Sequence, residues 1–130
     1  MVSKKVTVAV SGYFNPLHVG HVEMICEAKK LGDKLVVIVN NDLQVRLKGS
    51  VPFMPVEERV KILRAIRYVD DVVVSIDTDA SVCKTLEMLR PSIFGNGGDR
   101  PDRESVPETK VCERYDIKMV FQLGDKIQRS

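Results

Sequence analysis

The stretch that decides the fold is Tyr13-Phe14-Asn15-Pro16-Leu17-His18-Val19-Gly20-His21, which contains both histidines of the chain. The apolar run Lys5–Val10 precedes it and is typical of a buried strand. Residues 22–31 then carry apolar side chains at helical spacing up to Leu31, and Gly32 is the predicted C-cap. The histidines are therefore expected in the turn that opens a helix, where backbone N–H groups and the helix dipole attract anions.

Two imidazoles in such a turn can donate hydrogen bonds to phosphate oxygens. They could stabilise the negative charge that develops on a phosphorus centre and on a leaving pyrophosphate. Gly20 lies between His18 and His21, so both rings can face the same side of the turn, and Gly12 and Gly20 allow a ligand close to the backbone. The alternatives are a structural pair of histidines and a zinc site, for which no third ligand is evident. The pattern predicts a phosphate-handling active site.

Size and composition indicate one soluble domain. The chain has 130 residues, 44% of them hydrophobic and 29% charged, and these values are ordinary for a globular protein. Its net charge of +2 is too small to favour nucleic acid or an anionic membrane, and no apolar run approaches the ~20 residues that span a bilayer. Cys26, Cys83 and Cys112 are far apart, each in a predicted helix, which favours buried thiols over disulfides or zinc. The basic N-terminus runs directly into a strand, so no signal peptide is expected and we predict a cytoplasmic protein.

Strands and helices alternate along the rest of the chain. Further strands are predicted at Lys34–Asn40, Asp71–Ile76, Ser92–Gly95 and Lys118–Gln122. Three further helices are predicted: one with Pro55 in its first turn, one from Ser81 as N-cap to Leu89, and one over Pro107–Tyr115. Residues 41–54 and 95–105 are predicted to be loops.

This alternation predicts a Rossmann-like α/β fold, a doubly wound five-stranded parallel sheet with the order 3-2-1-4-5. In such sheets ligands bind beyond the carboxyl ends of the strands, where the strand order reverses. Here the reversal lies between the first and fourth strands. The histidine turn and the loop Gly95-Asn96-Gly97-Gly98-Asp99 are therefore expected to meet in one crevice.

The same residues resemble a known family. His18-Val19-Gly20-His21 after a strand is similar to the HxGH signature of the cytidylyltransferase-like nucleotidyltransferases. Arg46-Leu47-Lys48-Gly49 and Gly97-Gly98-Asp99 look closest to the heptose-1-phosphate adenylyltransferase domains of bifunctional enzymes. Ala65-Ile66-Arg67-Tyr68-Val69-Asp70 is similar to glycerol-3-phosphate cytidylyltransferase. The other landmarks that resemble the family in their order are residues 28–33, 37–42, 55–59 and 69–72.

The resemblance implies that residues 1–130 form a single nucleotidyltransferase domain. It would move CMP or AMP from CTP or ATP to a small phosphorylated alcohol or sugar and release pyrophosphate, with Mg²⁺ bridging the phosphates. The catalytic residues would be His18 and His21, which stabilise the transition state, and Lys48, which neutralises the α-phosphate. The expected nucleotide-binding residues are Gly12, Tyr13, Phe14, Asn15, Gly20, Arg59, Gly95, Asn96, Gly97, Lys126, Gln128 and Ser130. The expected acceptor-binding residues are Asn40, Asp42, Gly98 and Asp99. No protein ligand to a metal is assigned.

For Lys48, a solvated loop lysine is the alternative, and for Asp99 a turn cap or a magnesium ligand. Two departures from the family pattern leave a second function open. Many members have Asp where this chain has Asn15, which keeps a hydrogen-bonding group but removes a charge. The family's ISTT-like stretch, which caps the triphosphate, corresponds to residues 124–130, and the following helix is missing, so either the chain is shortened or its lid is incomplete. The alternative function is a non-catalytic nucleotide-binding or sensor module.

The resemblance also implies an assembly. Family members are commonly homodimers, and the segment Arg64 to Asp71 is the expected contact surface. The alternative is an ordinary helix-to-strand connection with exposed polar residues.

Overall fold

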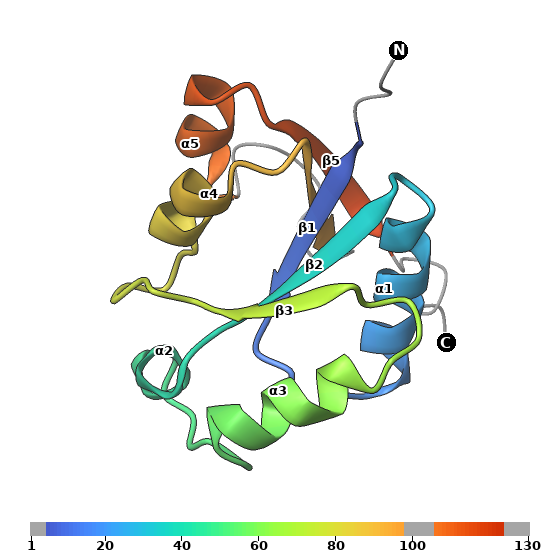
Figure 1. The fold of residues 1–130 in the computed structure, drawn as a ribbon. Helices are drawn as coiled ribbons and strands as arrows, with labels where there is room; N and C mark the ends of the chain where they lie inside the picture. Colours follow the sequence, from blue (N-terminus) through green and yellow to red (C-terminus); the bar gives the residue numbers. More distant parts are fainter. Residues whose placement is uncertain (1–4, 98–105, 124–130) are drawn as a thin grey trace.

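The computed structural model describes residues 5–97 and 106–123 (Figure 1). Within them, five parallel strands form one sheet in the order β3-β2-β1-β4-β5. The strands are β1 (Thr7–Gly12), β2 (Lys34–Val39), β3 (Asp71–Val74), β4 (Ile93–Gly97) and β5 (Lys118–Leu123). The helices are α1 (Val19–Lys29), α2 (Asp42–Leu47), α3 (Val56–Arg64), α4 (Cys83–Leu89) and α5 (Thr109–Arg114). The predicted fold class and strand order are confirmed.

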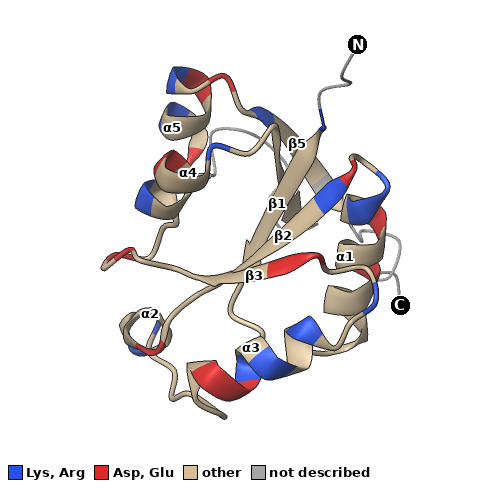
Figure 2. Cartoon of the chain, viewed as in Figure 1, with Lys and Arg blue, Asp and Glu red and all other residues tan. Residues whose placement is uncertain are grey.

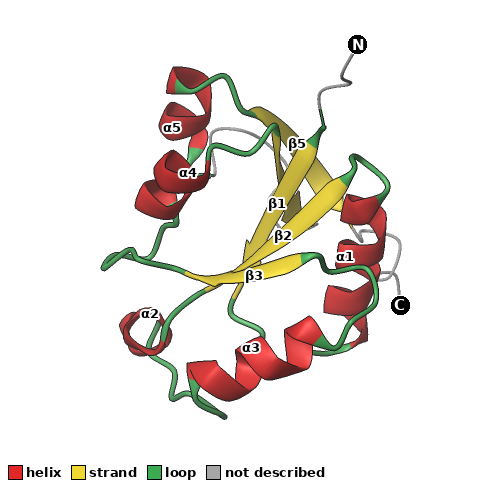
Figure 3. Cartoon of the chain, viewed as in Figure 1, coloured by secondary structure: helices red, strands yellow, loops and turns green. Residues whose placement is uncertain are grey.

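Helices cover both faces of this sheet, α1 and α3 on one side and α4 and α5 on the other (Figures 1 and 3). Successive residues of a strand point to opposite faces, so the central strand β1 contributes to two apolar cores. Val8 packs in a core with Ile25 of α1 and Leu63 of α3. Ala9 packs in a second core with Leu86 of α4. Burial on both faces explains why the strands read as continuous apolar runs.

Helix α3 shows how local charge supports an element. Pro55 is its N-cap rather than part of its first turn. Glu57 and Glu58 lie in the first turn, and Lys61 and Arg64 lie in the last (Figure 2). Each charge therefore interacts favourably with the nearer end of the helix dipole.

Residues 41–54, predicted as a loop, contain α2, which is a correction to the sequence analysis. The helix forms because Asn41 and Gln44 make a capping box: the Asn41 side chain accepts from the Gln44 N–H at 2.9 Å, and the Gln44 side chain accepts from the Asn41 N–H at 3.0 Å. The Asn-x-x-Gln spacing was therefore a usable signal.

Two smaller expectations were also wrong. Helix α1 ends at Lys29 with Lys30 as C-cap, and Gly32 is required instead because a Cβ there would lie 2.7 Å from the Val6 carbonyl oxygen. The N-cap of α4 is Val82, although the Ser81 hydroxyl still accepts from the Cys83 N–H.

Of the three thiols, that of Cys112 is buried, whereas Cys26 and Cys83 are partly exposed. Among the described residues, no helix has the length and apolar character needed to cross a bilayer.

Candidate active site

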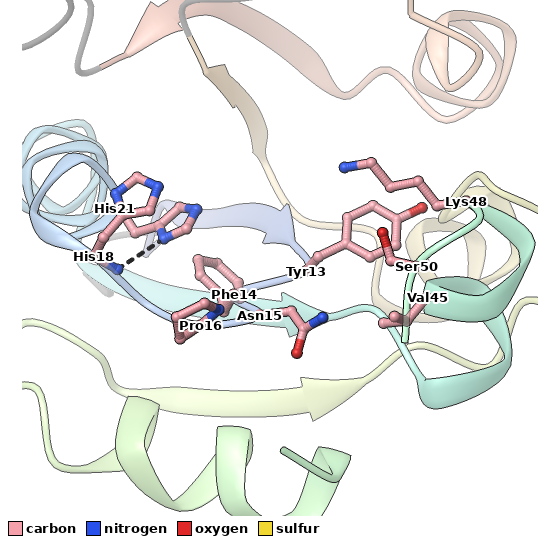
Figure 4. Close-up of a pocket in the computed structure, with 9 residues that line it drawn as sticks. All are labelled: Tyr13, Phe14, Asn15, Pro16, His18, His21, Val45, Lys48 and Ser50. Atoms are coloured by element: carbon pink, nitrogen blue, oxygen red, sulfur yellow. Dashed lines mark hydrogen bonds between the residues drawn. The ribbon is translucent and has the colours of Figure 1, made fainter. Parts of the chain in front are cut away.

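A pocket of about 220 Å³ opens beside the turn that follows β1 (Figure 4). Its lining residues come from the motif turn, the start of α1, and the α2 region: Tyr13, Phe14, Asn15, Pro16, His18, His21, Val45, Lys48 and Ser50. Pockets that enclose whole ligands usually have roughly 300–1,000 Å³, so this one suits part of a nucleotide, such as its phosphate chain. Val45 and Ser50 were not anticipated, because α2 was missed.

The two histidines sit at the N-terminus of α1, as predicted, and also cap that helix. His18 is the N-cap: its Nδ1 accepts from the Gly20 N–H at 3.1 Å. His21 Nδ1 accepts from the His18 N–H, also at 3.1 Å (Figure 4). The rings stack with 3.8 Å between their centroids, and Phe14 contacts His21 edge-on. Histidines thus occupy a capping box that usually has Ser or Thr and Glu.

These hydrogen bonds assign the protons on both rings. An Nδ1 that accepts a backbone hydrogen bond carries no proton, so each neutral imidazole holds its proton on Nε2 and donates from there. Burial, and secondarily the charge of His18, lowers the pKa of His21 to about 4. His21 is therefore neutral at physiological pH. The site therefore presents the Nε2–H groups of two stacked imidazoles at the positive end of the eleven-residue helix α1.

Lys48 supplies a full positive charge on the opposite wall. It is the C-cap of α2, and its ammonium lies 4.4 Å from the centre of the Tyr13 ring, within range of a cation–π contact. Figure 4 shows it extending over Tyr13 toward the histidine side of the pocket. Two imidazoles and one ammonium lie around a space that suits an anion.

Arg59 does not line this pocket but contacts the motif turn, part of which does. Its guanidinium is buried, donates to the carbonyl oxygens of Tyr13 and Asn40 at 2.7 Å each, and forms an ion pair with Asp42 at 2.6 Å. It also donates to the Met54 carbonyl. Arg59 therefore joins the motif turn to the ends of β2 and α2. Asn40 and Asp42, expected at the acceptor site, are both engaged in this cluster.

Packing against neighbouring rings requires glycine at positions 12 and 20 of the motif. A Cβ on Gly12 would lie 2.8 Å from the Phe14 ring, and one on Gly20 would lie 3.0 Å from the His18 ring. Phe14 itself is buried and adopts a positive φ of 49°. The motif's aromatic rings fold back over its glycines, so both positions shape the turn that presents the histidines.

On the β4 side, the described residues only partly cover the expected crevice. Gly95 pairs with Val10 in the sheet, so β4 ends beside the motif turn. Asn96 is buried, and its Nδ2 has no hydrogen-bond partner in the described part of the chain. Neither lines the pocket, and Gly97 pairs with Leu123 of β5 in the sheet. Gly98, Asp99, Lys126, Gln128 and Ser130 lie outside the described residues, and their roles stay predictions.

The described residues offer no cluster of side chains that could bind a metal ion. No Asp or Glu lines the pocket, and residues 5–97 and 106–123 contain no group of three His, Cys, Asp or Glu side chains able to hold a metal ion. The donor set suits phosphate oxygens better than Mg²⁺, which prefers carboxylate and water oxygens.

Comparison with known proteins places this geometry in a family. The cytidylyltransferase-like family model matches residues 9–125. FAD synthase of Pyrococcus abyssi (strain GE5 / Orsay) is 42% identical over 99 residues, which cover 75% of this chain and 66% of that protein. Bifunctional protein HldE of Streptomyces coelicolor is 45% identical over 110 residues, covering 83% of this chain and 23% of that protein. The chain thus spans just under two thirds of the FAD synthase and about a quarter of HldE.

A solved structure agrees with these relatives. The lipopolysaccharide core biosynthesis protein from Thermoplasma volcanium GSS1 has a TM-score of 0.77 and 27% sequence identity, and the match covers 92% of this chain and 97% of that one. The similarity to FAD synthases was not anticipated from the sequence, whereas the family was. The chain belongs to the cytidylyltransferase-like family.

Proposed function

We propose that this chain is a nucleotidyltransferase that moves AMP from ATP to a phosphorylated acceptor and releases pyrophosphate. One observation carries the proposal: two histidines, whose Nδ1 atoms accept backbone hydrogen bonds, direct Nε2 donors from a helix N-terminus into a pocket that Lys48 flanks. Similarity to FAD synthases and HldE supports ATP over CTP as the donor, because FAD consists of FMN joined to AMP.

In the proposed reaction, an oxygen of the acceptor phosphate forms a bond to the α-phosphorus of ATP. The bond from that phosphorus to the β-phosphate oxygen breaks, and its electron pair leaves with pyrophosphate. His18 and His21 would donate hydrogen bonds to the oxygens on which charge builds up, and Lys48 would neutralise the α-phosphate. No residue needs to gain or lose a proton in this scheme. Removing one such donor commonly reduces the rate by about 10²–10³-fold.

Magnesium enters this proposal as part of the substrate. Since the described pocket offers no carboxylate, Mg²⁺ would arrive coordinated by the triphosphate, as MgATP, and no residue of the chain is assigned to it.

For the acceptor we favour FMN over a sugar phosphate. The segment bordering the pocket exposes the apolar side chains of Leu47, Val51 and Phe53, with exposed fractions of 54%, 76% and 72%. Such side chains suit a flat, largely apolar ring system better than a sugar. The FAD synthase relatives support the same choice.

The proposal is tested by following pyrophosphate release. The purified protein is incubated with Mg²⁺, each of the four triphosphates, and FMN, a heptose phosphate or glycerol 3-phosphate. Turnover with ATP and FMN is expected. Binding of ATP in a thermal-shift assay, with no turnover on any acceptor, would favour the non-catalytic nucleotide-binding or sensor module.

The proposal extends to assembly and location. A homodimer would use the segment from Arg64 to Asp71, where Arg67 is exposed and stacks over Tyr68 at 5.6 Å. Light scattering at micromolar concentration tests it, and a monomeric mass would refute it. A cytoplasmic location fits the free thiols of Cys26 and Cys83.

A further inference from the structure

We propose that Asn15 is a positioning residue that latches residues 50–53 to the motif turn, and that an aspartate at this position cannot replace it. The inference rests on the proposed function, since Ser50, at the start of the latched segment, lines the pocket next to Lys48. It assigns to Asn15 a role other than contact with the nucleotide or with Mg²⁺.

The latch consists of two hydrogen bonds of opposite direction. Asn15 Nδ2 donates to the Val51 carbonyl oxygen at 3.0 Å, and the Phe53 N–H donates to Asn15 Oδ1 at 2.5 Å. The two backbone partners fix the orientation of the amide. In a flipped amide, the oxygen would face the Val51 carbonyl oxygen and the NH₂ group would face the Phe53 N–H, so neither hydrogen bond could form. The amide of Asn15 thus satisfies one backbone acceptor and one backbone donor of the segment.

A carboxylate cannot make the same pair of bonds. Asparagine offers one donor and one acceptor group, whereas ionised aspartate offers acceptors alone. With Asp at this position, one carboxylate oxygen would still accept from the Phe53 N–H, but the other would face the Val51 carbonyl. The N15D variant would therefore lose one bond and gain a repulsion.

Residues 51–53 depend on this latch for their position. In the described part of the chain, their tertiary hydrogen bonds both go to Asn15. Val51 and Phe53 are exposed, so side-chain packing holds them weakly. Lys48 and Ser50, just before them, line the pocket together with Asn15. Releasing the segment would allow the Lys48 wall to move away from the histidines.

The decisive test uses Asn15→Asp, because its protonated form regains the missing donor. A neutral carboxyl has one O–H donor and one carbonyl acceptor, like an amide. We expect ATP, measured with Mg²⁺ by calorimetry, to bind N15D about tenfold more weakly than wild type at pH 8. The ratio of the two affinities should fall to about fourfold at pH 4.5, where nucleotide binding is coupled to protonation of part of the carboxyl. Thr78→Asp adds the same charge at an exposed position, and its ratio should stay near one at both pH values.

Amide hydrogen exchange reports the latch without any nucleotide. The Phe53 amide should be protected in the wild type and should exchange at least about tenfold faster in Asn15→Ala, while the Val10 amide in the sheet is unchanged. Equal Phe53 exchange in both proteins would overturn the proposal, as would an N15D deficit that is absent or independent of pH. If the wild type binds no ATP, the proposed function fails, and the exchange result still decides whether the latch exists.

Discussion

At the residue scale, the two ring nitrogens of each histidine have separate roles. Nδ1 of His18 and Nδ1 of His21 accept backbone hydrogen bonds and hold the turn, which leaves the Nε2 donors for a ligand. The HxGH pattern predicted that both rings would face one side, and the ring stacking confirms it. The sequence could not reveal the capping role, because capping boxes are normally recognised by Ser, Thr, Asp or Asn followed by Glu or Gln.

The neutral state of His21 has a consequence for stability. Because its pKa is lowered from 6.5 to about 4 in the folded protein, the unfolded chain binds more protons between these values. The stability linked to His21 is therefore complete above pH 6.5 and is lost as the pH falls toward 4. We expect chemical denaturation to show a free energy of unfolding that declines over this window, and a smaller decline in His21→Gln, which can keep the cap. An equal decline in both proteins would contradict this assignment.

Arg59 shows where residue-type reasoning has limits. An arginine in a helix rich in charge is usually exposed, and nothing in the spacing indicates that Arg59 is buried against the carbonyl oxygens of two loops. We expect Arg59→Met to reduce the free energy of unfolding by about 3 kcal/mol, since it removes the donor to two buried carbonyl oxygens and the ion-pair partner of Asp42. The matched variant Arg64→Met, exposed on the same helix, should change it by less than about 0.5 kcal/mol. A similar effect of both variants in urea titrations would refute the structural role.

At the element scale, the short helix α2 escaped prediction, whereas the five strands and the other four helices were predicted. The apolar runs of β1 and β2 are long enough to be read directly, whereas α2 has six residues and no apolar stripe. Instead, α2 is held by Gln44, which is fully buried. Its Oε1 accepts from Asn40 and Asn41, and its Nε2 donates to the carbonyl oxygens of Asp79 and Ser81. One side chain thus joins the loops that follow β2 and β3.

The anchoring of α2 predicts a specific cost. Replacing Gln44 by Leu keeps the bulk but leaves several buried polar groups without partners, so we expect a loss of about 2–3 kcal/mol in the free energy of unfolding. Leu43→Ala, on the exposed side of the same helix, should cost less than about 1 kcal/mol. Urea denaturation measures both. A Gln44→Leu protein as stable as the wild type would show that α2 is held in another way.

At the scale of the whole molecule, the topology explains why the site lies where it does. Placing β1 between β2 and β4 brings the motif turn to the sheet end, where the order reverses. That location was predictable from the alternation of strands and helices. The wall formed by Lys48 and Ser50 was less so, because its position depends on single polar contacts, from Asn15 and Arg59, that carry no periodic signal.

The central claim is that the Nε2 donors of the histidine pair drive pyrophosphate release. The double variant His18→Asn/His21→Gln tests it most directly, because it copies the Asn41/Gln44 capping box and so should keep α1 and the melting temperature. With ATP and the best acceptor, we predict that pyrophosphate release falls at least about 100-fold. Release by the folded variant at a rate close to that of the wild type would contradict the account.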